Sequence, residues 1–83
     1  MDADRERKHL EEADRHIANA KATIEQQKKI IEKLIQEKHG TKVAVSLLHA
    51  MEHSLQAFEQ HRKTILELLD TLEALEKNGG SVR

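Results

Sequence analysis

Apolar residues recur at alternating steps of three and four along nearly the whole chain, and a glycine interrupts the pattern at position 40. This heptad spacing places the apolar side chains on one face of a helix, where a second helix can cover them. The pattern continues for about four heptads on each side of Gly40, and the chain has no proline. The sequence therefore predicts an all-α fold in which two long amphipathic helices form an antiparallel coiled-coil hairpin.

Capping residues indicate where the two helices begin and end. Asp2 or Asp4 can cap the first helix, which we expect to run over residues 2–39. Gly40 is expected to supply the left-handed residue after it, and Thr41 to cap a second helix over residues 42–77. Residues 1–78 then form a single hairpin domain with a turn at residues 40–41, so that residue i lies near residue 81 minus i, and residues 79–83 form a flexible tail.

Two rows of residues, at the heptad positions called a and d, form the predicted core. Gln27 and Arg62 fall in these rows, and His16 and His61 lie beside them. We expect these four side chains to form a polar layer that fixes the register of the helices. The predicted core and dimer-interface residues are Leu10, Ile17, Ile24, Ile31, Leu34, Leu48, Met51, Leu55, Phe58, Ile65, Leu69 and Leu72.

The apolar stripe is wider than a two-helix hairpin can cover. A chain of 83 residues without cysteine also has no disulfide to support a small core. These features predict a homodimer in which two hairpins form a four-helix bundle; a higher homo-oligomer or docking onto another protein remains an alternative. The predicted second-interface residues are Ile30, Ile35, Val45, Leu47, Leu66, Leu68 and Leu75.

Charged residues make up 35% of the chain, yet the net charge is −1. Acids precede bases by four residues at pairs such as Glu11–Arg15 and Glu25–Lys29, which is typical of a solvated helix surface. With no positive field, we expect neither nucleic acid nor an anionic membrane as a partner. A small RNA-binding hairpin dimer stays an alternative because it would have the same general shape. The basic cluster that could serve it consists of Arg5, Arg7, Lys8 and Arg15. No apolar span or signal peptide is evident, which predicts the cytoplasm.

The chain has six histidines, and histidine is the commonest metal ligand. His49 and His53 are four residues apart on one helix, and His16 and His61 lie at the edge of the core, so these four are the weak metal candidates. No third ligand is evident beside them. We therefore expect no metal and no cofactor, and a metal-binding, haem-binding or pH-sensing bundle is the alternative. Ser46 and Ser54 lie within the second helix without a positioned base, so we expect no enzyme activity.

A resemblance supports the same fold. The stretch Ala13-Asp14-Arg15-His16-Ile17-Ala18 precedes an isoleucine heptad and the Gly40-Thr41 turn. With Ser46-Leu47-Leu48 and His61-Arg62 further on, it resembles a group of small bacterial helical-hairpin proteins, frequent in alphaproteobacteria, that have no known activity. The resemblance spans about residues 13–73 and implies only the fold and a bacterial origin. Together, these observations predict a non-enzymatic interaction or scaffold protein that acts through homo-oligomerisation and helix-mediated binding of a protein partner.

Overall fold

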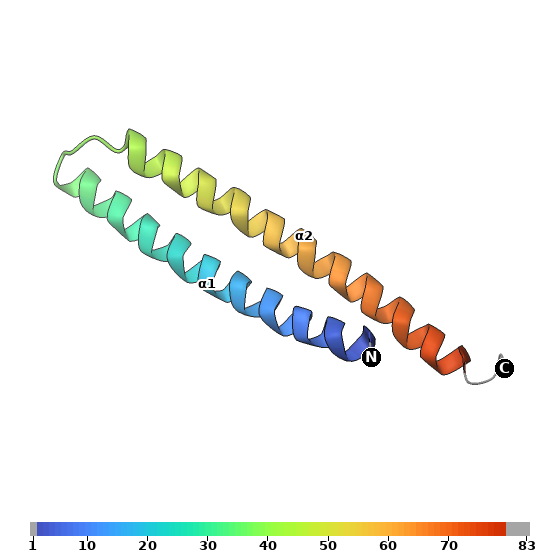
Figure 1. The fold of residues 1–83 in the computed structure, drawn as a ribbon. Helices are drawn as coiled ribbons and strands as arrows, with labels where there is room; N and C mark the ends of the chain where they lie inside the picture. Colours follow the sequence, from blue (N-terminus) through green and yellow to red (C-terminus); the bar gives the residue numbers. More distant parts are fainter. Residues whose placement is uncertain (1, 80–83) are drawn as a thin grey trace.

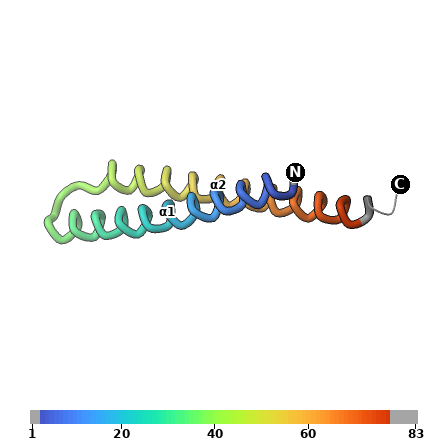
Figure 2. Tube along the Cα trace, turned by 60° about the horizontal axis from the view of Figure 1, so that its bottom comes forward, coloured from blue at the N-terminus to red at the C-terminus, as the bar shows by residue number. Residues whose placement is uncertain are grey.

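The computed structural model describes residues 2–79, and within this range it contains two α-helices and no strand. Helix α1 runs over Asp2–Gln36 and helix α2 over Lys42–Gly79. The helices lie side by side in opposite directions, with the connection at one end (Figures 1 and 2). The predicted all-helical hairpin is confirmed. Helix α2 continues to Gly79 instead of ending at Lys77, and residues 80–83 of the predicted tail lie outside the described residues.

The end of α1 differs from the prediction. The left-handed residue is Lys38, with φ 59°, and no glycine of the described range has a positive φ. The amide of His39 donates to the carbonyl of Leu34 at 2.9 Å, and that of Lys38 donates to Ile35 at 3.0 Å. This pair of bonds is the Schellman motif, in which the left-handed residue follows the last helical turn. The predicted helix end at His39 and the predicted role of Gly40 are therefore wrong.

The start of α2 lies where the sequence indicated. The amide of Val45 donates to the carbonyl of Thr41 at 2.8 Å, which is the first hydrogen bond of the helix. Thr41 is thus the residue that caps α2, and the connection between the helices consists of residues 37–41.

Burial follows the two heptad rows in both helices. All twelve predicted core residues are at least half-buried, and Ile24, Ile65 and Leu69 are buried. The rows also continue to the start of α1, where Ala3 is buried and Glu6 is half-buried. No large side chain of the described residues is fully buried, because each helix is covered on one side only. The hairpin therefore has a line of contact between two helices instead of an enclosed core.

The predicted register holds at the open end of the hairpin and differs nearer the turn. Arg7 pairs with Glu73, which is one residue from its predicted partner. A turn centred on residues 40–41 would place Asp14 opposite Glu67 and Gln27 opposite Ser54. Asp14 instead accepts a hydrogen bond from Arg62, and Gln27 donates to the backbone of Ala44. The contacts therefore depart most from the predicted register near the five-residue connection, where α1 ends earlier than predicted.

Replacing Lys38 by glycine tests the geometry of the turn. A left-handed conformation costs a non-glycine residue on the order of 1–2 kcal/mol, and a cation near the end of a helix returns about 0.3 kcal/mol. We expect Lys38→Gly to raise the free energy of unfolding by about 0.5–1 kcal/mol, measured by urea unfolding followed by circular dichroism at a fixed protein concentration.

Gly40→Ala is the matched control. A Cβ atom at Gly40 would meet nothing within 4 Å, and its φ is not positive. We expect this substitution to be neutral or to stabilise the hairpin by about 0.5 kcal/mol. A loss of stability at Gly40 together with no gain at Lys38 would contradict the observed helix end.

Candidate interaction surface

The line of contact between the helices has two edges of different chemistry. One edge, which we call the charged edge, carries Arg7, Lys21 and Lys28 on α1 and Glu52, Glu59 and Glu73 on α2. The other, which we call the uncharged edge, carries His16, Thr23 and Ile30 on α1 and Leu47, Ser54, His61, Leu68 and Leu75 on α2. These sets are the flanks of the same heptad rows, so the two edges lie on opposite sides of the contact line.

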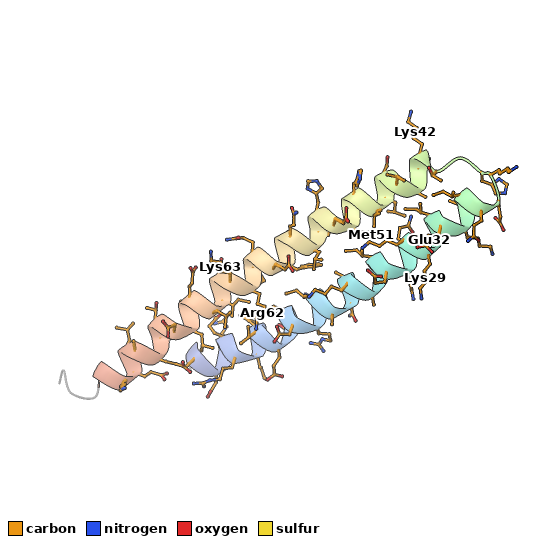
Figure 3. The ribbon with its side chains drawn as sticks, turned by 180° about the vertical axis from the view of Figure 1, so that it is seen from behind. Lys29, Glu32, Lys42, Met51, Arg62 and Lys63 are labelled. Carbon is orange, nitrogen blue, oxygen red and sulfur yellow. The ribbon has the colours of Figure 1, made fainter. Side chains whose placement is uncertain are left out.

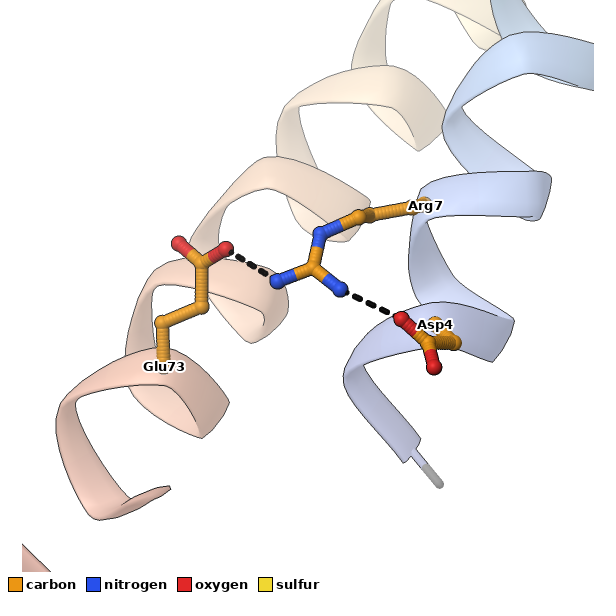
Figure 4. A network of polar contacts seen from close by, with 3 residues as sticks. All are labelled: Asp4, Arg7 and Glu73. Carbon is orange, nitrogen blue, oxygen red and sulfur yellow. Dashed lines mark hydrogen bonds and ion pairs between the residues drawn. The ribbon is translucent and has the colours of Figure 1, made fainter. Parts of the chain in front are cut away.

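The charged edge joins the two helices by ion pairs. Arg7 donates to Glu73 on α2 at 2.8 Å and to Asp4 on its own helix at 2.6 Å (Figure 4). The hydrogen bond to Glu73 is the main cause that raises the pKa of the Arg7 guanidinium. Further along the same edge, Arg62 donates to Asp14 at 2.5 Å. Figure 3 shows the side chain of Arg62 between the helices, whereas that of Lys63 points away from them.

Two shallow grooves of about 360 and 400 Å³ lie along this charged edge. Lys21 and Glu59 line the first, and Lys28 and Glu52 line the second. Because acids and bases face one another across these grooves, the edge has no excess of one charge that would select an ionic ligand. Its charges instead favour one alignment of α1 against α2.

The uncharged edge carries most of the exposed large apolar side chains. Six of the seven predicted second-interface residues are exposed, and the seventh, Val45, is half-buried. Val43, which the sequence prediction left out, is exposed as well, and the exposed fractions range from 37% for Leu66 to 83% for Val43. Ile30, Leu47, Leu68 and Leu75 lie on the uncharged edge with Val43 beside it, while Ile35 and Leu66 lie on the charged edge.

A groove of about 250 Å³ opens on the uncharged edge. Ala20, Thr23, Met51, Ser54 and Phe58 line it, and Figure 3 shows Met51 on the side of α2 that faces α1. The lining is uncharged and includes the only aromatic side chain of the chain. Such a surface suits an apolar side chain of a partner better than an ionic ligand.

The histidines do not come together in the hairpin. The ring of His16 lies against Phe58, with 5.5 Å between the ring centroids, and both His16 and His61 are exposed. No hydrogen bond, ion pair or ring contact between residues 2 and 79 joins His16 to His61. His49 and His53 are exposed on α2, and no three potential metal ligands of the described residues form a group.

The predicted polar layer is reduced to one buried side chain. Gln27 is only 6% exposed, and its Nε2 atom donates to the backbone carbonyl of Ala44 at 2.9 Å. Arg62 is half-buried at the charged edge, and His16 and His61 are exposed, so these residues do not share a layer with Gln27. Gln27 therefore ties the last third of α1 to the first turn of α2.

None of the helices in the described part of the chain has a segment that is both long and apolar enough to cross a membrane. Comparison of the chain with family models, with curated proteins and with solved structures gives no match. The resemblance to the bacterial hairpin group therefore stays a prediction, and the two edges of the hairpin are the features that point to a function.

Gln27→Leu tests what the buried amide contributes. A leucine of similar volume would bury apolar surface and would not have to be desolvated as an amide is. We expect the free energy of unfolding to rise by about 1 kcal/mol, measured by urea unfolding at a fixed protein concentration. Gln26→Leu is the control. Gln26 directly precedes Gln27 and is exposed, so this substitution should change the free energy of unfolding little. A clear loss of stability in Gln27→Leu would mean that the bond to Ala44 outweighs the cost of burying the amide.

Proposed function

We propose that this protein is a non-enzymatic helical interaction or scaffold protein that works as a homodimer, in which two hairpins form a four-helix bundle. The observation that carries the proposal is the set of exposed leucine, isoleucine and valine side chains on a hairpin whose own core is only partly covered. Fully burying one such side chain contributes about 1.5–3 kcal/mol, so covering several of them is a strong driving force for association.

The half-buried core residues support the same proposal. Met51, Phe58 and Leu72 lie in the predicted core rows, yet each keeps part of its surface exposed. A second layer of helices over them would complete the core in the way that four-helix bundles do. A small chain without disulfides has few other ways to add buried apolar area.

The outer surface of such a bundle would serve a protein partner. Acids and bases alternate over the outer faces of both helices, which provides polar pairing without a strong field. In this proposal, a partner helix docks on the outer surface of the bundle, and the protein acts in the cytoplasm as an adaptor between chains.

The second candidate is a bundle that binds a ligand or senses pH through its histidines. The contact between His16 and Phe58 beside the uncharged groove favours it, because two hairpins meeting there would bring several imidazoles close together. Histidine is the side chain that gains charge between about pH 5 and pH 8. A change of assembly in that range would distinguish this function from that of a scaffold.

Native mass spectrometry of the untagged protein tests the proposal, since the chain has no Trp or Tyr for optical detection. We expect a dimer without added mass at about pH 7.5 and about pH 5.5, values on either side of the ordinary histidine pKa of about 6.5. The reason is that apolar burial, which does not titrate, holds the two copies together.

A monomer at every concentration would contradict the proposal. Added mass of a metal or haem, or a dimer that dissociates only at the lower pH, would favour the histidine-based function. In that case, replacing His16 and His61 by glutamine should remove the ligand or the pH dependence while the dimer persists. The matched control is the same replacement at His49, which is exposed on α2 away from the uncharged edge.

A further inference from the structure

Helix α2 carries a second heptad pattern on the side next to the uncharged edge. Its residues alternate in steps of four and three over 33 positions, from Val43 to Leu75, and every one of them is exposed in the hairpin. We call this set the second seam. It consists of Val43, Leu47, Ala50, Ser54, Ala57, His61, Thr64, Leu68, Thr71 and Leu75.

The second seam contains no Asp, Glu, Lys or Arg. Ten residues taken at random from a chain that is 35% charged would include three or four of them. The equivalent face of α1 contains Arg5, Glu12 and Lys33, so this property belongs to α2 alone. A charge-free heptad row on an exposed helix face is the pattern of a helix that packs against a second partner helix.

We propose that a second copy of this chain docks on the second seam, with the two α2 helices packed antiparallel against each other. The inference rests on the proposed self-association and specifies the face and the orientation. The α2 helices then pack against each other within the four-helix bundle, and each α1 packs beside its own α2.

Side-chain size favours the antiparallel orientation. When the two copies meet about a twofold axis near residue 59, each larger residue of one copy lies opposite a smaller residue of the other. Facing layers interdigitate in this way, whereas a parallel pair would place each leucine of the seam opposite itself and each alanine opposite itself. The opposing pairs are Leu47 with Thr71, Ser54 with Thr64, His61 with Ala57, Leu68 with Ala50 and Leu75 with Val43.

The residues next to the seam are complementary in the same register. On its outer side, His53 of one copy faces Glu67 of the second copy, and Gln60 faces its own equivalent at the twofold axis. On its inner side lie Met51 and Phe58, which are half-buried and line the uncharged groove. A second copy would cover the surface that the hairpin leaves open there.

The area of the seam is most of what a stable dimer needs. The rise of 1.5 Å per residue makes the seam about 48 Å long, and a strip about 10 Å wide on each copy gives about 960 Å² in total. Stable specific interfaces begin at about 1,200 Å², and the surface of Met51 and Phe58 beside the seam would add to the buried area. The charged edge offers no comparable surface, because its lysines and glutamates already face each other within the hairpin.

Matched glutamate substitutions test which face is used. Ala50 lies in the second seam opposite Leu68 of the second copy, and Ala22 is exposed on the outer face of α1. We expect Ala50→Glu to weaken dimerisation at least about 100-fold, because a carboxylate would enter an apolar contact twice per dimer. Ala22→Glu should leave the dimer unchanged. Sedimentation equilibrium measures the association, and circular dichroism measures the helix content of each variant.

Engineered cysteines test the orientation without depending on the stability of a charged variant. The chain has no native cysteine, so Ser54→Cys and Thr64→Cys each introduce a single thiol. In the proposed register, Ser54 of one copy faces Thr64 of the other, while two Ser54 positions are about 15 Å apart along the axis, which is too far for a disulfide. After joint refolding and mild oxidation, we expect the two variants to form a mixed disulfide. Each variant oxidised alone should form little disulfide-linked dimer.

The outcomes separate this inference from the proposed function. Loss of the dimer in Ala50→Glu and a mixed disulfide between the two cysteine variants would support the antiparallel seam. A dimer that survives Ala50→Glu, or a self-linked Ser54→Cys dimer, would overturn the seam or its orientation while self-association stands. A wild-type chain that stays monomeric would overturn both.

Discussion

Two helices in contact can shield only one strip of each other, and the rest of this structure depends on that limit. The described part of the chain has five buried apolar residues, two of which are alanines, and no large side chain in it is fully enclosed. A hairpin of this kind gains little from the hydrophobic effect alone. The ion pairs at the charged edge and the single buried amide of Gln27 therefore set the alignment of the helices, and the apolar surface that is left over becomes the means of association.

The heptad spacing was sufficient to predict the helices, the hairpin and the residues of the contact line, because helix periodicity depends only on local geometry. The turn could not be predicted in the same way. Glycine is the usual left-handed residue after a helix, yet Lys38 takes that conformation two residues before Gly40. The register near the turn was wrong for the same reason, since the end of α1 decides which residues of α2 lie opposite there.

The candidate surface was predictable in composition but less so in arrangement. Six flank residues could be identified from their heptad positions because a hairpin has no third element to cover them. The polar layer was not correct, since the exposure of His16 and His61 depends on a register that the sequence does not state. Val43 was not predicted because it lies outside the flanks of the first heptad rows, on the neighbouring face of α2 where a second heptad pattern runs.

The hairpin also has an order of assembly built into its shape. Gln27 and Ala44 are 17 residues apart in sequence, Asp14 and Arg62 are 48 apart, and Arg7 and Glu73 are 66 apart. Contacts near the turn therefore close short loops, and each one reduces the entropic cost of closing the next. We expect the chain to fold from the turn outward, in the rapid manner of proteins with mainly local contacts, and its backbone amides to exchange with solvent most slowly near the turn and fastest at the open end.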